Sequence, residues 1–343
     1  MSLTHSQALA DRGGVVDLEH DHHPDSRMAH WPVVARLGRL RAAGGGFSIW
    51  IQLRGQTRVI AREGSFNLGP GEWLALDRGS VPELQAGRYG ATLGMLLPVE
   101  GNGRGCAEVL PGRGRMSMRD LRIAIRLWRN GRRTARARSS DAASERALQS
   151  MLLHLCALQC ELDGGISRSP GRSVRRKRQV FGRMQRARLF LEGHRDRVVR
   201  LTELAELTSF SSWYLSKTFH VIYEESPQAA SVRLRLEHAC ELLAHSDRSI
   251  SEIGASCGFD NSCSFARAFR ARYRTTATAY RQSSRNSVAV VANRSASARA
   301  MSSTRWSASA SSRRPCRATR SSTRSSCRCW RPRPRSSRRW HSP

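Results

Sequence analysis

A short helical pattern that occurs twice in the C-terminal half constrains this chain more than any other feature. Residues 201–207 predict a short amphipathic helix, and a tight turn separates it from a second helix over 212–219. Ser211 suits the N-cap of that second helix, because its hydroxyl can accept a backbone N–H. Leu215 and Phe219 are four residues apart and therefore share the buried side. The spacing predicts a compact helix-turn-helix unit.

The same pattern returns after one long predicted helix over 230–245. Ser249 and Glu252 form a capping box, in which the glutamate reaches back to the serine amide. Gly258 suits the left-handed backbone of the next turn. The helix that follows, about 261–272, buries its two phenylalanines, Phe265 and Phe269. An opening helix over 179–194 completes an all-α domain that we place at residues 179–282.

The buried residues fix which side chains the second helix of each unit turns outward. In the first unit these are Trp213, Ser216, Lys217 and His220. In the second unit they are Ser262, Ser264, Arg267 and Arg270, with Cys263 nearby. A solvated helix face is the alternative explanation for any one of these side chains.

Residues 201–281 resemble the DNA-binding domain of the AraC/XylS family of transcription regulators. The motifs that carry the resemblance are Leu204-Ala205, Tyr214–Phe219, Ser226-Pro227, Arg233–Ala239, Leu242-Leu243, Ile250–Ile253, Gly258-Phe259, Phe265–Phe269 and Tyr280-Arg281. The resemblance implies two helix-turn-helix subdomains that place two recognition helices in successive major grooves. The DNA-binding residues expected on this basis are Ser211, Trp213, Ser216, Lys217, His220, Ser262, Ser264, Arg267 and Arg270. Lys217 and Arg267 can donate to guanine or to a phosphate, and Trp213 can contact a thymine methyl group.

The chain departs from the family pattern in the two closing turns. Glu224 stands where the family usually has glycine in the first turn, and Arg274 and Ala277 replace both glycine and proline in the second. Gly254 lies inside a predicted helix, where glycine costs up to about 1 kcal/mol relative to alanine. We therefore expect the second unit to be less stable or less specific than is usual in the family.

The N-terminal half has the sequence pattern of a β domain. Residues 47–53 show the alternating side-chain pattern of a strand, and this pattern resumes at residues 57–60 after Gly55. Residues 73–76 form a short apolar segment after a Gly-Pro-Gly-Glu turn. Short strands with frequent glycine turns indicate a sandwich or barrel. The turn resembles one found in cupin-type jelly rolls, which suit small-ligand sensing. No histidine occurs between His30 and His154, so a cupin-type metalloenzyme site is not expected.

The predicted fold class is α+β: a β-rich, cupin- or jelly-roll-like domain, an all-α domain with two helix-turn-helix units, and a disordered C-terminal tail. Two helical stripes follow the strands. The stripe from Leu148 to Leu162 serves either dimerisation or, as we favour, covering of the sheet. The predicted organisation is a flexible leader over 1–29, a β-rich sensor with covering helices over 30–165, a basic linker over 166–178, the DNA-binding domain, and a disordered Ser/Arg-rich tail over 283–343.

The net charge of +31 favours a polyanionic partner. Residues 286–343 contribute 14 arginines and no acid, which leaves +17 on residues 1–285. That tail is either genuine or an out-of-frame extension. No apolar run approaches the ~18 residues that span a bilayer, so neither a membrane partner nor secretion is expected. The nine cysteines show neither a disulfide framework nor zinc spacing and indicate reduced thiols in a cytoplasmic protein.

These features predict a sequence-specific, effector-responsive transcription regulator, and we favour an activator over a repressor. Its expected partners are double-stranded DNA, a small-molecule effector, RNA polymerase and, in one alternative, a second copy of the chain. The rival hypothesis is non-specific nucleic-acid binding driven by the basic tail. No cofactor or metal is expected, although a His/Asp cluster at residues 20–25 leaves metal binding open as a minor alternative. No nucleophile or acid–base motif indicates an enzyme.

Overall fold

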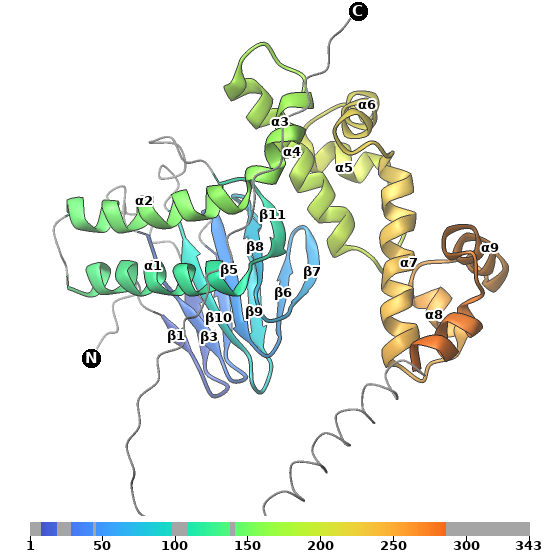
Figure 1. The fold of residues 1–343 in the computed structure, drawn as a ribbon, viewed down its shortest axis with the longest axis horizontal. Coiled ribbons are helices and arrows are strands. Elements are labelled where there is room, and N and C mark those ends of the chain that lie inside the picture. The colour runs from blue at the N-terminus through green and yellow to red at the C-terminus, as the bar shows by residue number, and fades with distance from the viewer. Residues whose placement is uncertain (1–7, 19–28, 44–45, 98–108, 138–140, 286–343) are drawn as a thin grey trace, which may run out of the picture. The chain divides into compact units, whose positions relative to one another are not determined.

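The computed structural model describes residues 8–18, 29–43, 46–97, 109–137 and 141–285, which include a β-rich N-terminal part followed by helices (Figure 1). This arrangement confirms the predicted α+β class. The tail over 286–343 and the His/Asp cluster at residues 20–25 lie outside the described residues. No described helix combines the length and apolar character needed to cross a membrane.

Two sheets make up the β-rich part. One has the strand order β1-β3-β10-β5-β8-β11 and the other β2-β4-β9-β6-β7. The strands of the first sheet are Leu9–Ala10, Val33–Ala35, Ala91–Leu96, Ser48–Arg54, Glu72–Leu76 and Gly112–Arg115, in that order. Those of the second are Val15–Leu18, Arg39–Ala42, Glu83–Ala86, Thr57–Ala61 and Gly64–Leu68. The three predicted strands are confirmed as β5, β6 and β8.

The central strand β5 is buried on both faces. Trp50 lies in a core that both sheets build, together with Val59, Phe66 and Leu84 of the second sheet. Ile49 and Ile51 point the opposite way, into a second core shared with helices. The period of two residues along a strand explains this division.

Helices α1 (Met118–Arg136) and α2 (Asp141–Leu158) cover that second face of the first sheet (Figure 1). The indole N–H of Trp128 in α1 donates to the Gly94 carbonyl of β10 at 2.8 Å. The helix also approaches the sheet closely at Gly131, where an added Cβ would lie 2.3 Å from the Trp31 ring. Leu148, Leu152 and Leu155 of α2 lie in the same core and cover the sheet as predicted, whereas Leu162, the last residue of the predicted stripe, packs against the core that α4 shares with the following helices.

Part of the predicted flexible leader over 1–29 forms strands instead. Strands β1 and β2 lie within residues 1–29 and pair in parallel with β3 and β4. Ala10 and Leu18 are buried in the core between the sheets. Segments of two and four residues carry too little periodicity to be recognised alone, because their partners lie about 24 residues further along the chain.

The predicted basic linker over 166–178 is helical at both ends. A 3₁₀ turn at Cys160–Leu162 leads into α3 (Asp163–Arg168), and α4 (Val174–Gly193) starts five residues earlier than the predicted opening helix. Ser173 supplies the N-cap, since its side chain accepts from the Arg176 amide at 3.2 Å. Arginine and lysine favour helix as strongly as most residues, so basic composition alone does not indicate a linker.

Helix α4 belongs to two cores. Leu189 lies in the core between the two sheets, whereas Phe181, Met184 and Phe190 lie in a core formed with the following helices. A buried ion pair joins the same two regions. Arg186 of α4 donates from Nε to Glu63 Oε1 at 2.9 Å, and Glu63 also accepts from the Ser80 hydroxyl at 2.8 Å. The β6–β7 turn also packs tightly on α4, because a Cβ on Gly193 would lie 2.2 Å from the Glu63 carbonyl oxygen.

We predict that Arg186→Met lowers the free energy of unfolding of the full chain by about 3 kcal/mol, measured by denaturant titration. Glu63 is fully buried and would lose its opposite charge. The double variant Glu63→Gln/Arg186→Met should lose less, because no unpaired carboxylate remains. The control Arg188→Met, on the same helix, removes the more exposed Arg188–Glu192 pair and should cost about 1 kcal/mol or less. Equal losses in the two single variants would contradict the prediction.

Candidate nucleic-acid interface

The first helix-turn-helix unit consists of α5 (Leu201–Thr208) and α6 (Ser212–Tyr223). Between them the backbone turns at Ser209, which has a left-handed φ of 54°. Ser211 is the N-cap of α6, as predicted, and its hydroxyl accepts from the Tyr214 amide at 3.3 Å. Leu215 and Phe219 are buried in the core that α4 shares.

The second unit consists of α8 (Ile250–Ser256) and α9 (Ser262–Tyr273). The predicted capping box is present, since Ser249 and Glu252 exchange hydrogen bonds of 2.8 and 3.2 Å. Asn261 is the N-cap of α9 rather than its first residue, and its side-chain oxygen accepts from the Ser264 amide at 2.8 Å. Phe265 and Phe269 are buried in a separate small core.

The two recognition helices match each other residue by residue at an offset of 50. N-cap Ser211 corresponds to Asn261, buried Leu215 to Phe265, and buried Phe219 to Phe269. The closing residues Glu224 and Arg274 both have left-handed φ angles, of 61° and 57°. The outward faces must therefore also correspond, since both helices have the same phase.

The outward face of α6 carries Trp213, Lys217 and His220, all of which are exposed. Trp213 is 69% exposed, an unusual state for so large an apolar side chain. The Lys217 ammonium lies 4.9 Å from the centre of the Trp213 ring, so the two side chains form a cation–π pair. Ser216 lies at the edge of this face and is half-buried.

The outward face of α9 carries Arg267 and Arg270, again exposed, with Cys263 one turn before them. Ser264 is half-buried, and its hydroxyl donates within the N-cap to Asn261 at 2.9 Å. Ser262 lies 3.0 Å, oxygen to oxygen, from Ser251 of α8. The structure thus brings the two predicted arginines together and puts the two predicted serines at the edges of the face.

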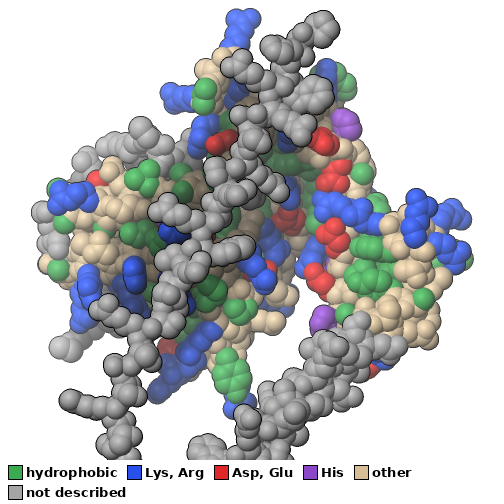
Figure 2. Space-filling model, viewed as in Figure 1, with side chains coloured by type: hydrophobic (Ala, Val, Ile, Leu, Met, Phe, Trp, Pro, Cys, Tyr) green, Lys and Arg blue, Asp and Glu red, His purple; other side chains and the backbone are tan. Residues whose placement is uncertain are grey.

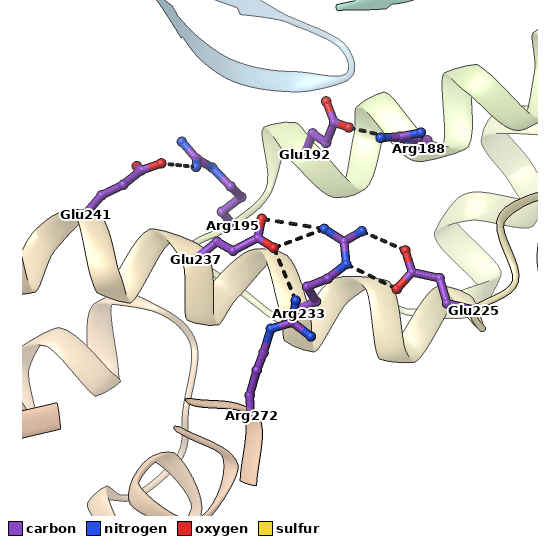
Figure 3. A network of polar contacts seen from close by, with 8 residues as sticks. All are labelled: Arg188, Glu192, Arg195, Glu225, Arg233, Glu237, Glu241 and Arg272. Atoms are coloured by element: carbon purple, nitrogen blue, oxygen red, sulfur yellow. Dashed lines mark hydrogen bonds and ion pairs between the residues drawn. The ribbon is translucent and has the colours of Figure 1, made fainter. Parts of the chain in front are cut away.

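Helix α7 (Pro227–His245) joins the two units and carries the network that spaces them (Figure 3). Arg233 donates to Glu225, in the turn after α6, at 2.6 and 3.1 Å, and to Glu237 at 3.2 Å. Glu237 in turn lies 3.6 Å from Arg272 of α9. The hydrogen bonds that Arg233 donates to Glu225 raise the pKa of Arg233, with Glu237 adding to the effect. A continuous chain of charges therefore runs from the end of the first recognition helix to the second.

A second contact fixes the turn of the α8–α9 unit. Arg235 of α7 is buried and donates to the carbonyl of Gly258 at 2.7 Å. Gly258 has φ 73°, and a Cβ there would lie 2.7 Å from the Arg197 Cα. The segment before α5 therefore packs against the turn of the other unit, and only glycine fits between them.

The comparisons with known proteins agree with this geometry. A family model described as a helix-turn-helix domain matches residues 204–283. Regulatory protein PocR of Salmonella typhimurium is 35% identical over 100 residues, which cover 29% of this chain and 33% of PocR. The HTH-type transcriptional regulator CdhR of Pseudomonas aeruginosa is 32% identical over 103 residues, or 30% of this chain and 29% of CdhR.

This chain carries the double helix-turn-helix domain of the AraC/XylS family. A solved structure of a probable AraC family transcriptional regulator from Rhodopseudomonas palustris is 28% identical, covers 30% of this chain and 97% of its own, and has a TM-score of 0.29. The chain spans about a third of the length of the curated relatives it matches. The resemblance of residues 201–281 to the AraC/XylS DNA-binding domain is confirmed, and it concerns the C-terminal domain alone.

Two outward residues of the AraC-type domain were not among the predicted contacts. Cys263, exposed at the start of α9, corresponds to Trp213, and Arg274, exposed at the C-cap of α9, corresponds to Glu224 at the offset of 50. The spacing i, i+4 and i+7, counted from Cys263 to Arg267 and Arg270, would have identified Cys263. Among the described residues, no group of three or more side chains is placed to hold a metal ion.

The left-handed closing turns give a stability prediction. We expect Arg274→Gly to raise the free energy of unfolding by about 1 kcal/mol, because a side chain at φ 57° is strained and glycine is not. Denaturant titration of the full chain measures the change. Arg274→Ala removes the same charge but keeps the Cβ, so it should give no gain. A gain of the same size in both variants would assign the effect to charge.

Glu203 gives a pH prediction. Its pKa is held at about 2, below the usual 4.5, mainly by the side-chain hydrogen bond from Arg197 and also by the backbone N–H of Arg200. Because the folded pKa is depressed, the stabilisation is fully present above 4.5 and is lost as pH falls from 4.5 to about 2. Arg197→Gln should move the carboxyl pKa measured by NMR towards 4.5. Arg195→Gln, which removes the pairing with Glu241 instead, should leave it unchanged.

Proposed function

We propose that this protein is a sequence-specific DNA-binding transcription regulator that responds to an effector and activates its target. The observation that supports DNA binding is the pair of matched outward faces on α6 and α9. Each presents a cation at the same position, Lys217 on one and Arg267 on the other. Helix α7 and its charge network connect the two faces, and binding in two successive major grooves would require a fixed spacing between them.

The chemistry of the two faces differs. Arg267 and Arg270 offer planar guanidinium groups, which suit bidentate hydrogen bonds to guanine. Trp213 offers apolar area beside the Lys217 ammonium, and this combination suits a thymine methyl next to a phosphate or guanine. Ser211 is the N-cap of α6, and the Ser264 hydroxyl donates to Asn261, the N-cap of α9. Any contact that these serines make with DNA is therefore directed at a phosphate near the helix end.

The proposed response to an effector depends on α4, which packs in the cores of both domains. A cavity of about 210 Å³ lies where the end of α2, α3 and the first turns of α4 meet, and it is lined by Leu110, Gln159, Cys160, Ile166 and Arg178 among others. The Gln159 side chain bonds both the amide and the carbonyl of Leu110, at 3.0 and 2.8 Å. A small molecule bound here would contact the β domain and α4 together.

A footprint on selected DNA fragments tests the proposal against its rival, non-specific coating. One protected site of about two helical turns supports a specific regulator. Uniform protection that falls steeply with salt supports coating by basic segments.

We predict that Arg267→Ala weakens binding to the selected site by about 1–3 kcal/mol and weakens binding to random DNA much less. The reason is that a base contact is lost in addition to a charge. Arg267→Lys keeps the charge and should restore the affinity for random DNA but not the specificity. Competition binding assays on both DNAs measure the difference. Equal losses of affinity on the two DNAs in the alanine variant would show that Arg267 contacts only a phosphate.

A further inference from the structure

A row of arginines runs along the whole outer face of α1, in the β-rich domain and outside the AraC-type domain. The row consists of Arg119, Arg122, Arg126, Arg129, Arg133 and Arg136, at alternating spacings of three and four residues. That spacing keeps all six on one side of a helix. Eight side chains of α1 are exposed, and these six are among them, so the exposed face is cationic almost throughout. Figure 2 shows Lys and Arg side chains where Figure 1 places α1.

The charges of the row are not neutralised within the described part of the chain. None of the six guanidinium groups has an ion pair or side-chain hydrogen bond with a described residue. The one acid of α1, Asp120, accepts from Ser117 at the helix start and lies on another face. Burial lowers the pKa of the neighbouring Arg132, and the charge of Arg136 lowers it further. Six like charges held close together favour a polyanion that binds them at once.

The helix backbone that carries the row is held in place. Trp128 and Gly131 fix the opposite face of α1 to the sheet, through the hydrogen bond to Gly94 and the close approach to Trp31. Ser117 caps the helix, so its first turn is ordered as well. Binding therefore costs the ordering of the arginine side chains but not the ordering of the helix.

We propose that the arginine row binds the phosphate backbone of duplex DNA, as a second contact independent of base sequence. From Arg119 to Arg136 the helix rises about 25 Å, at about 1.5 Å per residue. Duplex DNA carries one phosphate charge per about 1.7 Å of its axis, so a helix of that length laid against the duplex faces several phosphates. Six guanidinium groups along the same length can pair with several of them at once, because arginine pairs well with phosphate oxygens.

Two other partners fit the row less well. An amphipathic helix that binds a lipid surface inserts its apolar side, but the apolar side of α1 is buried against the sheet at Leu121, Ala124 and Trp128. A protein partner would need apolar or aromatic anchors between the charges. Besides the arginines, the exposed residues of α1 are only Met118 and Asn130.

The test uses the full chain with Arg122, Arg126, Arg129 and Arg133 changed to glutamine. Glutamine has a similar helix propensity, so α1 should remain folded. A matched control changes Arg39, Arg41, Arg54 and Arg62, four exposed arginines elsewhere in the same domain, to glutamine. Affinity is measured against salt concentration on a duplex of about 80 base pairs, with either selected or random sequence. This length exceeds the two grooves that the AraC-type domain would occupy.

The row variant should lower the slope of log affinity against log salt by about 3–4 on both duplexes, at about 0.9 for each lost phosphate contact. The control should change the slope much less, and lysine at the same four positions should restore it. Equal slopes for the row variant and the control would overturn the proposal. So would an unchanged DNA slope together with lost binding to phosphatidylserine vesicles.

Phosphate binding by the arginine row extends the proposed function, but the same experiments can refute either one without refuting the other. A row variant that keeps the footprint position and loses salt dependence supports the second contact and leaves the specific site intact. If the wild-type chain gives no footprint, the specific regulator fails, whereas a reduced slope on random DNA still supports the row.

Discussion

The spacing of the two recognition helices depends on α7, because its apolar residues belong to two separate cores. Ala230 and Leu234 pack with α4, α5 and α6, whereas Leu236, Ala239 and Leu243 pack with α8 and α9. Each unit completes its core with residues of this shared helix. Burial thus attaches the two units to one helix, and the ion pairs of Glu225, Arg233, Glu237 and Arg272 connect them along it (Figure 3).

Helix α4 likewise belongs to two cores, in this case those of the β-rich domain and of the AraC-type domain. It gives Leu189 to the core between the sheets and Phe181, Met184 and Phe190 to the AraC-type domain. The buried Glu63–Arg186 pair and the close approach of Gly64 and Gly193 make this junction specific rather than merely apolar. A change in the β-rich domain that shifts the β6–β7 turn would therefore act on the helix that supports the first recognition unit.

Positive charge serves different purposes at different places. On α9, Arg267 and Arg270 face outward and suit base contacts, whereas Arg272 lies against Glu237. On α7 the arginines are engaged with glutamates or turn carbonyls and stabilise the domain. On α1 they stand in a row without such partners among the described residues. Only the first and third groups are available to a polyanion, so the high net charge alone overstates how much of the chain can contact DNA.

The sequence by itself determined the AraC-type domain, its inward and outward helix faces, the N-cap Ser211 and the main strands, because these depend on residues within a few positions of one another. Leu215, Phe219, Phe265 and Phe269 are buried as their spacing predicts. Contacts between distant segments were decided only by the tertiary structure: the pairing of β1 and β2, the two-sided burial of α4, the Arg197–Gly258 approach and the capping role of Asn261 beside Ser264. The physical reason is that a strand of two residues or a single glycine acquires its meaning from the partner packed against it, and that partner lies many residues away in the chain.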